Sequence, residues 1–211
     1  MIEPRVHAPS PRLPLAVLAV VTVGLVISGI GPADRFTWFL EVAPVLIGAP
    51  ILIATRVRFP LTPLVYVLVG LHAYILMIGG HWTYAKVPFG FWIQDVFHMA
   101  RNPYDRIGHF AQGFIPAMIG REILLRRSPL RGSKWLPYVV LAFCFTLSVT
   151  YEFVEWWTAL ASGEAADAFL GTQGDPWDTQ WDMFLCGVGA TVSLLTLSRV
   201  QDHQLAKMGV A

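Results

Sequence analysis

Residues 102–110 read Asn-Pro-Tyr-Asp-Arg-Ile-Gly-His-Phe, and they open a long apolar run. Within them Asp105 and His109 stand four residues apart, so a helix that begins here carries an acid and an imidazole on one face. Two later stretches have the same character: Tyr-Glu-Phe-Val-Glu-Trp-Trp at 151–157 and Gly-Asp-Pro-Trp-Asp-Thr-Gln-Trp-Asp-Met at 174–183. All three lie at the ends of hydrophobic segments, where an ionisable group is costly unless it is paired or functional. The sequence therefore indicates a membrane protein with a buried polar cluster.

The composition agrees with this interpretation. Apolar residues make up 55% of the 211 residues and charged residues 14%, whereas a soluble domain has about 25% charged residues. The net charge is +1 and the basic residues are scattered in short loops, so nothing points to a nucleic-acid partner. Cys144 and Cys186 lie inside apolar runs, which predicts buried thiols rather than a disulfide.

The pattern predicts an all-α, polytopic membrane bundle of about six transmembrane helices. Because a helix needs about 20 residues to cross the hydrocarbon core, the spans are expected at 14–30, 37–55, 61–80, 106–125, 135–160 and 180–198. They form one transmembrane domain at 14–200, between a disordered N-terminus at 1–13 and a tail at 201–211. With the N-terminus inside, eleven of the fifteen lysines and arginines face the cytoplasm. This bias predicts that both termini are cytoplasmic.

An amphipathic segment at 89–99 interrupts the loop between the third and fourth spans. Its apolar residues share one helical face, and they are Phe89, Trp92, Ile93, Val96 and Phe97. An aromatic-rich helix of this kind lies in the membrane interface. Two interpretations remain open: the helix is a lid over the polar cluster, or it is a plain interfacial anchor with His98 facing water.

Polar residues recur at helical spacing at the outer end of three predicted spans. The three sets are Asp105, His109 and Gln112; Ser148, Glu152 and Glu155; and Asp175, Asp178 and Asp182. If the sets converge, they form an oxygen-rich site with one nitrogen ligand, which suits a divalent metal such as magnesium, manganese or zinc. We expect as metal ligands Asp105, His109, Glu152, Glu155, Asp178 and Asp182. For general acid–base chemistry we expect His109, Glu152, Glu155 and Asp182.

Helix capping can account for part of this set. The sequence from Asn102 to Asp105 is typical of a helix N-cap, a proline at the first helical position and an acid in the first turn, and Asp175 to Asp178 is similar. Capping does not explain the acids and the imidazole that lie deeper in apolar segments, but ion pairs with Arg101 or Arg106 remain an alternative for them. Glu41 and His72 are weaker candidates, because each stands alone on its helix.

The motifs at 104–113, 151–157 and 168–183 resemble the YjdF-type inner-membrane proteins of bacteria, a family of unknown function. The resemblance covers most of the chain from the second span onward, and it implies a multi-pass protein of the bacterial inner membrane. More distantly, the order of Asp and His-Phe, a late glutamate, and two aspartates is similar to the VanZ-like proteins. Members of that group are associated with resistance to glycopeptide antibiotics, which act at the cell envelope.

Three functional hypotheses follow. The leading one is an outer-facing divalent-metal or acid–base site that binds, or acts on, a lipid or envelope-lipid head group. The second is an accessory or assembly subunit that binds a membrane-protein partner, with a purely structural polar cluster. The third is a small proton- or cation-coupled transporter, for which the sequence offers no inverted repeat. Whether the protein is an enzyme is left open by the sequence.

Overall fold

The computed structural model describes residues 10–162 and 172–210. These residues form seven α-helices and one 3₁₀ turn, η1 (Tyr84–Lys86), without a β-strand. The helices are α1 (Arg12–Ser28), α2 (Arg35–Thr55), α3 (Pro63–Trp82), α4 (Pro88–Phe97), α5 (Tyr104–Arg127), α6 (Trp135–Ser162) and α8 (Asp178–Lys207). The predicted all-α membrane bundle is confirmed. Most of the predicted disordered N-terminus, and residues 168–171 of the motif at 168–183, lie outside the described residues.

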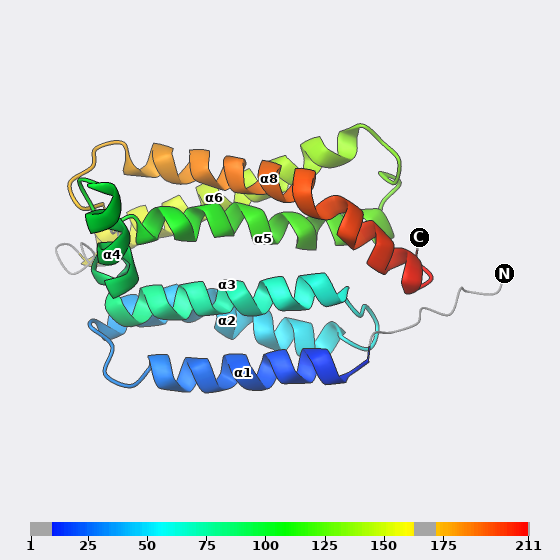
Figure 1. Ribbon diagram of the computed structural model, residues 1–211, viewed down its shortest axis with the longest axis horizontal. Helices are drawn as coiled ribbons and strands as arrows, with labels where there is room; N and C mark the ends of the chain where they lie inside the picture. Colours follow the sequence, from blue (N-terminus) through cyan, green and yellow to red (C-terminus); the bar gives the residue numbers. More distant parts are fainter. Residues whose placement is uncertain (1–9, 163–171, 211) are drawn as a thin grey trace.

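The long helices lie side by side in two layers (Figure 1). One layer holds α1, α2 and α3, the other holds α5, α6 and α8, and α4 lies across one end of the bundle. Among the described helices, α2, α3, α6 and α8 are long and apolar enough to cross a membrane, and α1 is a shorter apolar helix. Helix α5 is not among these candidate spans, because charged residues near both of its ends lower its mean hydropathy. It is also the most buried of the described helices.

Close packing of α5 against α8 forms the centre of one layer. A Cβ atom on Gly113 would lie 1.8 Å from the carbonyl oxygen of Cys186, and one on Gly189 would lie 2.0 Å from that of Phe110. The two backbones therefore touch, as small residues allow in membrane helix pairs. Helix α3 packs on α5 and so links the two layers.

A buried ion pair fixes the end of the bundle opposite α4. Glu122 is fully buried and accepts hydrogen bonds from the backbone N of Thr62 at 3.1 Å and from Thr62 Oγ1 at 2.7 Å. Arg126, four residues further along α5, pairs with the same carboxylate at 2.8 Å. Gln201 of α8 lies 3.4 Å from it. These contacts join α3, α5 and α8.

The helix starts differ from those that the capping patterns predict. Helix α5 begins at Tyr104, one residue later than expected, although the Asn102 side chain still accepts a hydrogen bond from the Tyr104 backbone N at 3.0 Å. Helix α8 begins at Asp178, so Asp175 is neither its N-cap nor on the same helical face as Asp182. Instead, Asp175 accepts a bond from the Trp177 backbone N at 2.9 Å, in the turn before the helix. Helix α8 also continues past residue 200, with Gln201 and Leu205 buried.

Candidate functional site

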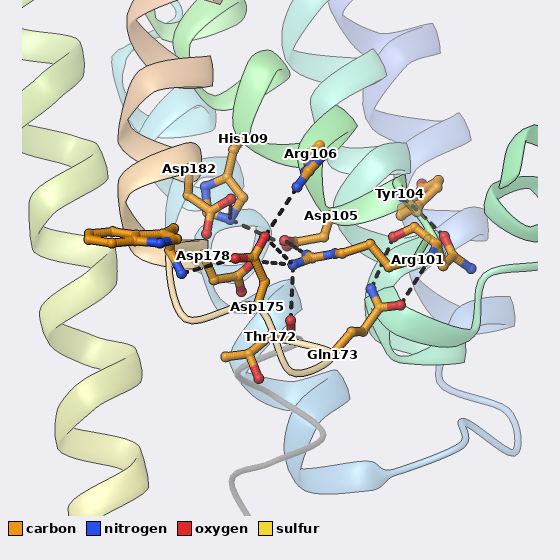
Figure 2. Close-up of polar contacts among 12 residues, drawn as sticks. Arg101, Tyr104, Asp105, Arg106, His109, Thr172, Gln173, Asp175, Asp178 and Asp182 are labelled. Carbon is orange, nitrogen blue, oxygen red and sulfur yellow. Dashed lines mark hydrogen bonds and ion pairs between the residues drawn. The ribbon is translucent and has the colours of Figure 1, made fainter. Parts of the chain in front are cut away.

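Arg101 is the hub of a polar cluster at the α4 end of the bundle (Figure 2). Its guanidinium group bonds to Asp178, pairs with Asp105 at 3.0 Å and lies 3.6 Å from Asp175. Arg106 pairs with Asp175 at 3.2 Å. Burial alone would lower the pKa of Arg101, but the bond with Asp178 and the nearby carboxylates outweigh it and raise the pKa. Ion pairing therefore accounts for Asp105, Asp175 and Asp178, the three acids that the capping patterns also covered.

The Arg101 hub also holds the segment that precedes α8. Arg101 donates to the carbonyl oxygen of Thr172 at 2.9 Å. The Gln173 side chain exchanges two hydrogen bonds with the backbone of Asn102, at 3.1 and 3.0 Å. Gln173 adopts a positive φ of 48°, which is uncommon for a residue other than glycine. These bonds fix Asp175 and Asp178 relative to the start of α5.

His109 lies one turn deeper along α5, between carboxylates of two helices. Its Nε2 atom lies 3.4 Å from Asp105 and 3.7 Å from Asp182 of α8. Its Nδ1 atom lies 3.2 Å from Oε1 of Gln112. Because an amide oxygen only accepts, this contact places a proton on Nδ1. Nε2 then faces the two carboxylates, where it carries a second proton or binds a cation. All three charged side chains are at least nine-tenths buried.

Two groups of potential metal ligands share His109. The first group is Asp105, His109 and Asp182, and the second is His109, Glu152 and Glu155. In each group, one ligand atom from each residue lies within 4.8 Å of the ligand atoms of the other two. One carboxylate oxygen each of Asp182 and Glu152 is buried without a hydrogen-bond partner. Such an oxygen is costly to bury in an apolar environment. Asp178, also predicted as a ligand, bonds to Arg101 and is in neither group.

A cavity of about 270 Å³ adjoins these groups between the two layers. Its lining includes Asp105, His109 and Glu155, and it extends to Glu41 of α2 and His72 of α3. The Tyr151 hydroxyl donates to Glu41 at 3.0 Å across the cavity. The two weaker candidates from the sequence thus face the same space as the stronger ones.

Helix α4 has the amphipathic character that the sequence predicts. Its aromatic side chains are exposed: the exposed fraction is 58% for Trp92 and 69% for Phe97. His98, at the end of the helix, is also exposed and has a left-handed backbone conformation. None of the residues that line the 270 Å³ cavity belongs to α4. A lid function for α4 stays a prediction.

Comparison with known proteins identifies the family. The family described as "Predicted membrane protein (DUF2238)" matches residues 13–203. The chain is 50% identical over 190 residues to the inner membrane protein YjdF of Escherichia coli (strain K12), which covers 90% of this chain and 91% of the relative. No solved structure matches.

The chain belongs to the DUF2238 family. The predicted resemblance to YjdF-type inner-membrane proteins is thereby confirmed, whereas the more distant similarity to the VanZ-like proteins stays a prediction. In this DUF2238 protein, the polar cluster comprises Arg101, Arg106 and His109 with seven acids, which are Glu41, Asp105, Glu152, Glu155, Asp175, Asp178 and Asp182.

The charges of this cluster do not balance. Its seven carboxyl groups face two guanidinium groups and the imidazoles of His109 and His72, so at least three carboxyls have no cationic counterpart even when both imidazoles are protonated. A buried carboxylate is stable only if it takes up a proton or pairs with a cation. The cluster therefore has the capacity to hold additional positive charge, as protons or as a bound cation.

Sequence reasoning missed part of the site. Tyr84 of η1 and Tyr151 of α6 line the cavity, but neither entered the candidate set. Tyr151 directly precedes the motif acid Glu152, and this was the available signal. Tyr84 follows the third span in a loop that gave no signal at all. Arg101 was considered only as an alternative partner, whereas it contacts three acids.

Proposed function

We propose that this membrane protein binds a divalent cation at His109 and uses it to bind, or act on, a lipid or envelope-lipid head group. The observation that carries the proposal is the buried Oδ1 atom of Asp182, which makes no hydrogen bond and lies 3.7 Å from His109 Nε2. A cation between Asp105, His109 and Asp182 would satisfy that oxygen and offset the negative charge of the cluster. The partnerless oxygen of Glu152 extends the same ligand set.

The donor set determines the kind of metal. One imidazole nitrogen with several carboxylate oxygens suits manganese or zinc, and magnesium where water completes the shell. Gln112 supports this role, because its bond to Nδ1 is the outer-shell contact that metal-binding histidines usually have. The adjoining cavity gives a head group access to the ion. The positive-inside rule predicts that the site lies on the outer side of the membrane.

Metal binding to the purified, chelator-treated protein tests the proposal. We expect about one manganese or zinc ion per chain by titration calorimetry and elemental analysis. His109→Ala and Asp182→Asn should weaken binding by at least about tenfold, since each removes a ligand. His203→Ala is the matched control, because His203 is exposed on α8. Equal binding by all four proteins, or none by the wild type, would rule out the metal site.

One observation favours a second candidate, the accessory or assembly subunit. Arg101 holds Asp105 and Asp178 in ion pairs that explain their burial without any ligand. If the whole cluster is structural in this way, a stoichiometric membrane-protein partner should co-purify. In that case Glu155→Gln should leave complex formation and complementation of a deletion strain unchanged.

A further inference from the structure

The 270 Å³ cavity has both polar and apolar walls. Asp105, His109 and Glu155 line it near α4, and Pro116 and Leu147 line it deeper in the bundle together with His72 and Tyr151. Pro116 lies eleven residues along α5 from Asp105, which is about 16 Å at 1.5 Å per residue. Since one water occupies about 30 Å³, the space holds on the order of ten non-hydrogen atoms. It therefore fits a small head group, with the rest of a lipid outside the cavity.

The charge of the cavity selects the kind of polar group. Its lining residues include three carboxylic acids, Glu41, Asp105 and Glu155, and no lysine or arginine. Asp105 is already engaged by Arg101 and faces His109. Glu41 is only 4% exposed and accepts a hydrogen bond from the neutral phenol of Tyr151. Neither Glu41 nor Glu155 has a lysine or arginine partner among the described residues, so the cavity favours a cationic group over an anionic one.

The packing of the helices shows where such a ligand can enter. Helix α2 packs mainly on α3, and α6 packs mainly on α5 and α8, so α2 and α6 flank the cavity rather than covering it. Leu147 of α6 lines the cavity and is nevertheless 38% exposed. In a membrane, that wall faces lipid. A ligand can therefore arrive from the bilayer with its chain still in hydrocarbon.

We infer that the cavity receives the ammonium head group of a membrane amphiphile, which enters from the lipid between α2 and α6. Glu41 and Glu155 bind the ammonium group, and the rest of the lipid leaves the cavity past Leu147. The inference deepens the proposed function by naming the class of lipid. It rests on that function only where it assumes a divalent cation bound beside the cavity at His109. An aminophospholipid such as phosphatidylethanolamine has the required chemistry.

Lipid retention by the purified protein is the test. The full chain is reconstituted in nanodiscs of equal phosphatidylethanolamine and phosphatidylglycerol, extracted in detergent, and analysed by native mass spectrometry. We expect phosphatidylethanolamine to be retained preferentially. Glu41→Gln should reduce its retention about tenfold, because it removes a charge-assisted hydrogen bond. Leu76→Trp should abolish retention by filling the cavity, and Val67→Trp, on the lipid-facing side of α3, should leave it unchanged.

Two further arms make the outcomes distinct. Competition with free ethanolamine separates recognition of the head group alone from recognition of the whole amphiphile; displacement at millimolar ethanolamine supports the head-group site. Metal content measured in the same samples should be unaffected by Leu76→Trp, so loss of lipid with metal retained supports this inference alone. Equal or preferential retention of phosphatidylglycerol, or retention that survives both Glu41→Gln and Leu76→Trp, would overturn it, whatever the metal result.

Discussion

At the scale of single residues, the cluster depends on two side chains with opposite roles. Arg101 neutralises acids that it contacts directly, and those contacts hold the segment before α8 against the start of α5. His109 shares Asp105 with Arg101 and also faces Asp182, with which Arg101 makes no ion pair. The first part of the cluster is therefore structurally complete, while the second part needs protons or a cation.

Loss of the Arg101 guanidinium should destabilise the protein. Arg101→Gln leaves Asp105 and Asp178 buried without their partner, which costs about 3 kcal/mol or more. We expect a lower thermal unfolding midpoint in detergent, and a partial recovery in the double variant Arg101→Gln/Asp178→Asn, since that variant no longer buries the unpaired charge. Arg199→Gln, at an exposed position of α8, is the control. An unchanged midpoint in Arg101→Gln would show that the ion pairs contribute nothing to stability.

Gln112 should act on metal affinity through His109. Gln112→Leu removes the acceptor for Nδ1–H and frees the imidazole to rotate or change tautomer, so manganese or zinc should bind about 10- to 100-fold more weakly. Gln112→Glu keeps an acceptor at this position and should retain most of the affinity. Calorimetric titration of both variants gives the answer. If Gln112→Leu binds as tightly as the wild type, the imidazole is not oriented by this bond.

Residue spacing explains what the sequence could and could not reveal about the site. Asp105 and His109 were predictable because helical periodicity puts residues four apart on one face. Glu152 and Asp182 were candidates because acids inside apolar runs are rare. Contacts between different helices produce no periodic pattern in the sequence. For this reason nothing in the sequence indicates that Tyr151 donates a hydrogen bond to Glu41.

At the scale of helices, the fold depends on the close approach of α5 and α8. Gly189→Ala would place a Cβ atom 2.0 Å from a backbone oxygen of α5, so the two helices must separate. Overpacking of this kind costs about 1–3 kcal/mol. By contrast, a Cβ on Gly48 of α2 meets nothing within 4 Å, and Gly48→Ala should stabilise its helix by about 0.5–1 kcal/mol. Thermal unfolding of the two variants should shift in opposite directions; a shift in the same direction would contradict the packing account.

The start of α2 should make stability depend on pH. Asp34 caps α2 by accepting a bond from the Thr37 backbone N at 2.6 Å, and this bond lowers the pKa of Asp34 below its ordinary value of 3.8. A depressed pKa means that the stabilisation is fully present above 3.8 and is lost as the pH falls through the lower folded-state value. Asp34→Ala should therefore cost about 1 kcal/mol at neutral pH.

The pH profile of that variant provides the check. The difference in unfolding temperature between the wild type and Asp34→Ala should be constant above about pH 5 and should shrink below pH 3.8. A difference that stays constant into this acidic range would show that the charged form of Asp34 is not what caps the helix.

Helix types and approximate lengths were predictable, whereas their first residues were not. Proline and asparagine signals placed the start of α5 within one residue, because the Asn102 side chain makes the expected capping bond. The same reasoning misplaced Asp175, since Arg101 and Arg106 hold its carboxylate in a turn outside α8. A cap pattern cannot reveal that distant arginines compete for the capping side chain.

At the scale of the whole molecule, the two layers and the position of α4 follow from six long helices that run from end to end (Figure 1). The start of α1 and the end of α8 lie at the same end of the bundle, opposite α4. Length and apolarity predicted this bundle, because lipid tolerates only helices with satisfied backbones. The polar α5 shows the limit of hydropathy: a helix surrounded by other helices need not be apolar.

Membrane topology is predicted by the distribution of basic residues, with both termini cytoplasmic and six crossings. Single cysteines at Ala33, between α1 and α2, and at Lys134, between α5 and α6, test this in intact cells. An impermeant maleimide should label Ala33→Cys at once, and Lys134→Cys only after lysis. The native Cys144 and Cys186 are buried and should stay unlabelled. The reverse labelling pattern would show that the protein has the opposite orientation in the membrane, with the polar cluster in the cytoplasmic half.

Pulsed electron–nuclear double resonance on the manganese-loaded protein, labelled with ¹⁵N histidine, tests the central claim most directly. Coupling to a histidine nitrogen shows that an imidazole ligates the ion. We predict coupling to one histidine, which disappears in His109→Ala and persists in His203→Ala. Manganese that shows no histidine coupling, or a coupling unchanged in His109→Ala, would contradict a cation site centred on His109.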